Sequence, residues 1–176
     1  MKRARVSIMF VVVSCAVIGC GYTTKSALPG HFRTVHVQPF KNRINYTTES
    51  RRTIYFPLLE VEITDAIIDR FLFDGNLRIA DADAADLILG GDLVGYDRGA
   101  LRYTDNDDVQ EYRVQVIVNM TVRDTREDVL LWRQNGFVGE ATYFVTGAQA
   151  ISEETAVENA TNDLARRIVE RIIEDW

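Results

Sequence analysis

The sequence predicts an α+β fold in which two helices pack on one face of a four- to five-stranded mixed, mostly antiparallel sheet. Two observations support this prediction. Apolar residues recur every three or four positions near residues 57–74 and 152–175, whereas other segments alternate apolar and polar residues. The resulting order is strand, helix, several strands and helix. That order is typical of a two-layer domain with one hydrophobic core.

The first predicted strand covers residues 33–40. Val35 and Val37 alternate with polar neighbours, which is the pattern of a strand with one buried face. Pro39 ends the pattern because proline cannot donate a ladder hydrogen bond. The polar residues 41–56 that follow are predicted to form a loop.

The first predicted helix begins at Pro57, since proline is favoured in a first helical turn. Its predicted buried stripe consists of Leu59, Ile63, Ala66, Ile67 and Phe71. Gly75 is expected to end the helix in the left-handed conformation. A short strand over residues 77–80 and an alanine- and aspartate-rich connector over 81–86 are predicted next.

Three longer strands are predicted to follow, over residues 87–98, 110–124 and 129–143. The second shows the most regular alternation, from Tyr112 to Val122. Residues 105–108 and 126–128 are expected to form the two turns. The pair Gly90-Gly91 within the first long strand predicts a β-bulge or a change of register.

The last predicted element is a helix from Ser152 to about Asp175. Ser152 is a suitable N-cap, and Glu153 and Glu154 suit the positive end of the helix dipole. The predicted buried stripe consists of Val157, Ala160, Leu164, Ile168 and Ile172, widened by Ala165, Val169 and Ile173.

The N-terminus has the features of a secretory signal peptide. Lys2, Arg3 and Arg5 precede a short, mostly apolar run that ends in Val17-Ile18-Gly19-Cys20. This run is short for a membrane span, and polar sequence follows it. We therefore expect residues 1–19 to be removed before Cys20, residues 20–32 to form a flexible tether, and residues 33–176 to form a single domain.

Composition limits the possible functions. The 176 residues carry a formal charge of −6, and residues 1–19 contain three basic residues and no acidic one. The remainder therefore carries −9, which argues against general nucleic-acid binding because that function needs a basic surface. Cys15 would leave with the signal peptide, so no disulfide or cysteine metal site is expected beyond Cys20.

Motifs for catalysis or cofactor binding are not found in the sequence. It lacks the nucleophile-elbow, zinc-protease, phosphate-loop and dinucleotide patterns. The aspartates at 81–86 and 105–108 lack calcium-loop spacing and are interpreted as solvated turns. We therefore predict a protein that is not an enzyme and that has no cofactor and no metal site.

The densest basic cluster consists of Lys41, Arg43, Arg51 and Arg52. Arginine guanidinium groups bind phosphate oxygens in a bidentate manner. One interpretation is a contact for anionic lipid or for an acidic partner. The other is a solvated loop that balances nearby carboxylates.

Val17-Ile18-Gly19-Cys20 resembles the bacterial lipobox. That resemblance implies that Cys20 receives a diacylglyceryl thioether and becomes the acylated first residue of the mature protein. Two or three acyl chains together give stable membrane anchoring. In lipoproteins with this motif an aspartate after the cysteine favours retention in the inner membrane, so the resemblance, with Gly21 at that position, implies the outer membrane.

Several further stretches, in their order and spacing, resemble the lipopolysaccharide-assembly lipoprotein family LptE. They are Cys20-Gly21-Tyr22, Leu28-Pro29-Gly30, residues 34–43, residues 59–71 running into 75–79, residues 85–91, residues 111–114, Leu131-Trp132 before Gly136-Phe137, and residues 163–176. The resemblance covers most of the chain after the predicted signal peptide.

The resemblance implies a lipid-anchored protein on the periplasmic face of the outer membrane. It implies two partners, lipopolysaccharide and the outer-membrane β-barrel translocon LptD, which such a protein plugs while lipopolysaccharide is delivered to the outer leaflet. Among the functional residues of the family, only Cys20 transfers to a definite position, through the lipobox.

The first half of the chain also resembles periplasmic lipoproteins of the LpoB and CsgG type. The shared pattern is the strand with Pro39-Phe40 and Asn42-Arg43, a helix, and residues 75–79. That alternative implies an activator of peptidoglycan synthases or a secretion component. The hairpin over residues 111–137 favours LptE.

Overall fold

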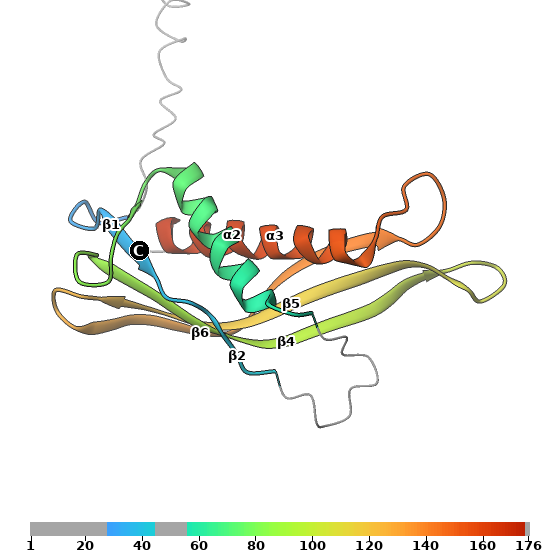
Figure 1. Cartoon of the computed structure of the whole chain (residues 1–176), viewed down its shortest axis with the longest axis horizontal. Coiled ribbons are helices and arrows are strands. Elements are labelled where there is room, and N and C mark those ends of the chain that lie inside the picture. Colours follow the sequence, from blue (N-terminus) through green and yellow to red (C-terminus); the bar gives the residue numbers. More distant parts are fainter. Residues whose placement is uncertain (1–27, 45–55, 175–176) are drawn as a thin grey trace, which may run out of the picture.

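A computed structural model describes residues 28–44 and 56–174 of the chain (Figure 1). The elements are β1 (Thr34–Val37), β2 (Lys41–Asn42), α2 (Leu59–Asp74), β3 (Arg78–Ile79), β4 (Leu87–Tyr103), β5 (Val109–Asp124), β6 (Val129–Phe144) and α3 (Glu153–Glu174). Among these residues, neither helix combines the length and the apolar character that crossing a bilayer would require.

The sheet is mixed and open, with strand order β3-β1-β4-β5-β6. β1 pairs in parallel with β3 and β4, and β4, β5 and β6 form an antiparallel meander. Both helices lie on one face of this sheet (Figure 1). The predicted α+β class is therefore confirmed.

One short strand was not predicted. Lys41–Asn42 forms β2, which pairs in parallel with β4 and brings the number of strands to six. The predicted loop over 41–56 is therefore wrong for these two residues. Pro39 interrupts pairing after β1, and the chain then rejoins the same edge of β4 with Lys41 opposite Asp92.

The core lies between the sheet and the two helices. On β5, Val114, Val116, Val118 and Val122 are 0% exposed and Met120 is 1% exposed, so the alternation predicted for this strand is confirmed. The stripe predicted for α3 is buried at every position. On α2, Ala66 lies partly exposed while Thr64 is buried in addition to the predicted residues.

Two of the helix ends follow the sequence signals, whereas α2 begins at Leu59, after a left-handed Leu58, and the predicted start at Pro57 is wrong. The N–H of Gly75, at φ 77°, donates to the carbonyl of Phe71 at 3.0 Å and ends α2. At the start of α3, the Ser152 hydroxyl accepts from the Thr155 N–H at 3.1 Å.

The glycine pair in β4 does not form the predicted bulge. Gly90 and Gly91 pair regularly with β5, and the register shifts between Leu93 and Gly95 instead. The two glycines allow the side chains of Gln38 and Phe40 to lie directly against the backbone of β4. A Cβ on Gly90 would lie 2.7 Å from Oε1 of Gln38, and one on Gly91 would lie 2.3 Å from the ring of Phe40.

The segment before β1 contacts the core. Leu28 and Phe32, which belong to the predicted tether, pack against it, and Phe32 is 5% exposed. The N–H of Phe32 donates to the carbonyl of Pro29 at 3.0 Å and closes a turn. Packed structure therefore includes residues on the N-terminal side of residue 33.

Candidate functional site

Two of the predicted contact residues lie within the structure. Lys41 is on β2 and Arg43 follows it directly, and both are exposed. Because they are two residues apart on extended chain, they lie on the same side of it. Asn42, between them, donates to Glu60 of α2 at 3.2 Å. Arg51, Arg52 and Cys20 lie outside the described residues.

Lys41 lines an open cleft of about 740 Å³. The cleft forms where residues 38–41 cross β4 at the glycine pair. Its other walls come from β5 and β6. The lining residues are His36, Gln38, Pro39, Phe40, Lys41, Gly90, Gly91, Asp92, Asn119, Met120, Thr121, Arg133 and Asn135.

The cleft carries two unengaged cations. Within residues 28–44 and 56–174, the side chains of Lys41 and Arg133 make no hydrogen bond and no ion pair, although both backbones pair in the sheet. The carboxylate of the cleft, Asp92, lies 3.7 Å from Nε of Arg43. Nδ1 of His36, which also lines the cleft, donates a hydrogen bond to the carbonyl oxygen of Ala80 at 3.0 Å. An acidic protein thus holds a local site suited to an anion.

Sequence reasoning missed Arg133 because strand register brings it to the cleft. Lys41 pairs with Asp92, and Asp92 pairs with Asn119. Two residues further along β5, Thr121 pairs with Arg133. The alternation of exposed and less exposed residues along β6 is enough to place Arg133 on the exposed face of the sheet. Its nearness to Lys41 depends on three correct pairings across the sheet.

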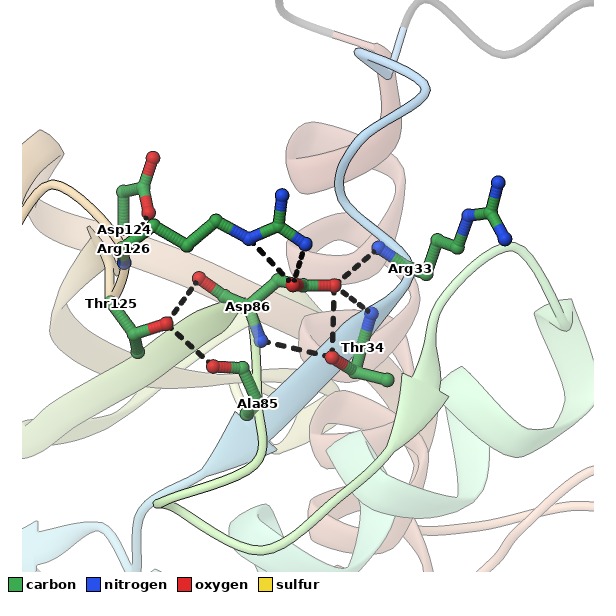
Figure 2. A network of polar contacts seen from close by, with 7 residues as sticks. All are labelled: Arg33, Thr34, Ala85, Asp86, Asp124, Thr125 and Arg126. Atoms are coloured by element: carbon green, nitrogen blue, oxygen red, sulfur yellow. Dashed lines mark hydrogen bonds and ion pairs between the residues drawn. The ribbon is translucent and has the colours of Figure 1, made fainter.

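A polar network around Asp86 holds the strand ends together at one end of the sheet (Figure 2). One oxygen of its carboxylate accepts from the N–H of Arg33 at 2.8 Å, and from the N–H and hydroxyl of Thr34 at 3.1 and 3.0 Å. The other oxygen accepts from Nη2 of Arg126 at 2.5 Å. Thr125 donates its hydroxyl to the carbonyl of Ala85 at 2.6 Å.

These contacts lower the pKa of Asp86. Burial by itself opposes ionisation, but the hydrogen bonds from Arg33, Arg126 and Thr34 outweigh it and lower the pKa from 3.8 to about 2. The charged carboxylate therefore ties β1, the start of β4 and the turn between β5 and β6 to one another. This arrangement fixes the end of the domain at which β1 begins.

A second polar cluster holds the start of α3 on β4. The hydroxyl of Tyr96 donates to Glu153 at 2.7 Å, and Arg98 forms an ion pair with the same carboxylate. Burial, the hydrogen bond to Glu153 and its negative charge raise the pKa of Tyr96 far above its usual value. Burial and Glu153 also raise the pKa of Tyr143. We interpret this cluster as a structural clamp.

The protein is a two-layer α+β domain that carries a cation-bearing cleft on its sheet. Solved structures that share its fold include three bacterial proteins. A protein from Xanthomonas campestris is 10% identical, with 84% of this chain and 88% of that chain covered and a TM-score of 0.57. A hypothetical protein from Chlamydia trachomatis is 13% identical, with 80% of this chain and 95% of that chain covered and a TM-score of 0.52. An uncharacterised lipoprotein B from Nitrosomonas europaea is 12% identical, with 83% of this chain and 84% of that chain covered and a TM-score of 0.52. These low identities establish the shared fold alone.

The chain belongs to the lipopolysaccharide-assembly family LptE, whose model matches residues 32–174. The family resemblance seen in the sequence is thereby confirmed. The protein is, in this general sense, a cell-envelope lipoprotein of lipopolysaccharide assembly, and its family is non-enzymatic. No curated protein matches the chain.

Proposed function

We propose that this protein is an outer-membrane lipoprotein that plugs and helps to assemble an LptD-like β-barrel, and that it thereby helps to deliver lipopolysaccharide to the outer leaflet. The observation that carries the proposal is the family match, which spans nearly all of the described fold. Such a role needs a rigid domain and fitting surfaces, and it needs no catalytic group.

The outer face of the sheet supports this role. The face opposite the helices is largely polar on β5 and β6, because the alternate residues there include Arg113, Gln115, Asn119, Thr121, Arg133, Glu140 and Thr142. The interior of an outer-membrane barrel is also polar. A domain inserted in such a barrel would keep these side chains hydrogen-bonded to the wall or to water.

The cleft gives the proposal a ligand contact. Lipopolysaccharide is a polyanionic amphiphile, and Lys41 and Arg133 supply positive charge without a competing partner in the described chain. An arginine guanidinium can bind two phosphate oxygens at once. We assign the cleft to an anionic group of lipopolysaccharide, with Arg51 and Arg52 as further candidate contacts on the same predicted loop.

The double variant Lys41→Gln/Arg133→Gln tests this assignment. We expect purified protein to lose about tenfold in affinity for lipopolysaccharide, since each lost phosphate contact weakens binding. The control Arg166→Gln/Arg171→Gln removes the same charge from α3. Equal loss in both variants would show that net charge alone determines binding, and the cleft assignment would be wrong.

Anchoring through Cys20 is a separate part of the proposal. Intact-mass measurement of the membrane-extracted protein should show a chain that begins at Cys20 and carries diacylglycerol and an additional acyl group. An unmodified N-terminus on protein released without detergent would overturn it.

Depletion of the protein tests the function as a whole. Surface lipopolysaccharide should fall, and unassembled barrel should accumulate. Complementation with the full-length chain should restore both. Normal surface lipopolysaccharide in depleted cells would contradict the proposal.

A further inference from the structure

The two most exposed large apolar side chains of the described residues are adjacent, in the last turn of α2. Phe73 is 80% exposed and Leu72 is 64% exposed. Cζ of Arg70 lies 5.3 Å from the centre of the Phe73 ring, and most of the ring faces solvent. Single exposed apolar side chains are common on protein surfaces, but an adjacent pair this exposed leaves a contiguous apolar area in water.

This end of α2 adjoins the point at which the chain enters the domain. After Gly75 the chain turns into β3, and the N–H of Arg78 donates to the carbonyl of Arg33 at 3.0 Å, just before β1. Phe73 and Leu28 each lie five residues from that contact, and five residues span at most about 18 Å. Figure 1 shows α2 ending and β1 beginning at the same end of the molecule.

The proposed lipid anchor is within short reach of the same end. Cys20 precedes Leu28 by eight residues, which span at most about 28 Å, and Leu28 packs against the core. β4 runs from Leu87, which pairs with Val35, to Tyr103, over about 50 Å. The linking segment therefore confines the α2 end to the neighbourhood of the bilayer but does not confine the turn after Tyr103.

Two exposed arginines lie at this end as well. Arg33 and Arg78 are neighbours through the backbone hydrogen bond between them. In Figure 2 the guanidinium group of Arg33 points away from the Asp86 network. Across residues 28–44 and 56–174, neither guanidinium group makes a hydrogen bond or an ion pair, and such groups suit lipid phosphates. Because the exposed Asp81 and Asp83 on the next turn offset this charge, the apolar pair selects the partner.

We propose that Leu72 and Phe73 insert into the surface of the phospholipid bilayer to which the chain is anchored. The inference rests on the lipid anchor at Cys20 in the proposed function, and it names the part of the domain that meets the lipid. Two apolar side chains bind a bilayer weakly by themselves. The anchor holds lipid at a high effective concentration beside this end, so that a small contact suffices to orient the domain.

The full-length lipidated protein, reconstituted into vesicles of phosphatidylethanolamine and phosphatidylglycerol, tests the proposal. Its processed form has no free thiol, because Cys15 leaves with the signal peptide and the sulfur of Cys20 is in the thioether. Phe73→Cys therefore carries a single environment-sensitive NBD fluorophore. The control Tyr103→Cys carries the same probe on an exposed position at the far end of β4. Flotation verifies that both proteins are bound to the vesicles.

We expect nitroxide-labelled phospholipid to reduce the fluorescence of the probe at residue 73 by about twofold or more, and that of the probe at residue 103 by less than about a tenth. Adding Leu72→Asp to Phe73→Cys should remove about half of the quenching, because a carboxylate opposes insertion.

Three results would overturn the inference while leaving the anchor intact. They are equal quenching at residues 73 and 103, protein that floats with the vesicles but is not quenched at residue 73, and quenching that Leu72→Asp leaves unchanged. The second result would assign the apolar pair to a protein partner, and the third would show that the linking segment alone holds this end near the lipid. Protein that does not float would contradict the anchor at Cys20 and the inference with it.

Discussion

The most direct test of the described fold is the substitution Asp86→Asn. It keeps the shape of the side chain and removes the charge that accepts hydrogen bonds from Arg33, Thr34 and Arg126. The side chain of Asp86 is 13% exposed but that of Arg126 is 55% exposed, so solvent screens the ion pair more than the hydrogen bonds from Thr34. A pKa of about 2 in place of 3.8 corresponds to about 2 kcal/mol of folding stability at neutral pH.

The pH dependence follows from the sign of this change. Because the pKa of Asp86 is lower in the folded state, its contribution is complete above about pH 5 and is lost as the pH falls toward 2. In urea titrations, the wild type should exceed Asp86→Asn by about 2 kcal/mol at pH 7, by about half of that at pH 3, and by little at pH 2.

The matched control is Asp105→Asn, in the exposed turn between β4 and β5. Its free energy of unfolding should lie within about 0.5 kcal/mol of the wild type at pH 7. A stability difference between wild type and Asp86→Asn that stays constant from pH 7 to pH 2 would refute the reasoning, because neutral packing would then account for the whole effect.

Three further predictions concern the attachment of α3. Gly139→Ala places a Cβ 2.4 Å from a backbone oxygen of α3 and should cost about 2 kcal/mol in chemical denaturation, whereas Gly99→Ala, with open space around it, should cost less than about 0.5. Ser152→Ala removes the N-cap and should lower the free energy of unfolding by about 1 kcal/mol, measured in the same way. Glu153→Gln should lower the pKa of Tyr96, seen as earlier ionisation of one tyrosine in an ultraviolet pH titration; an unchanged titration would contradict the clamp.

Local patterns were sufficient to predict the helices and the long strands. The apolar stripes from Leu59 to Phe71 and from Val157 to Ile172 repeat over several turns, and β5 alternates without interruption on its buried face. The ends of the helices at Gly75 and Ser152 were also readable, because a left-handed glycine and a hydroxyl cap act within a few residues.

Features that depend on tertiary contacts could not be read in this way. Gly90 and Gly91 give the local signal of a bulge, but the crossing of Gln38 and Phe40 explains them. Arg133 joins Lys41 only through the register of the sheet, and β2 exists only because β4 offers a free edge beyond β1. Pairings between distant segments are weakly encoded in local sequence.

The candidate cleft shows the same limit. The cleft was half visible in the sequence, since Lys41 belongs to the predicted basic cluster and Arg133 does not.

The central claim is that this protein acts by fitting into an outer-membrane barrel. Affinity purification of the tagged mature protein from detergent-solubilised outer membranes, with quantitative mass spectrometry, tests it most directly. We predict one large β-barrel protein in equimolar amount with the tagged chain. Recovery of a peptidoglycan synthase, or of a ring formed by the chain itself, would contradict the claim and favour the LpoB or CsgG type of function.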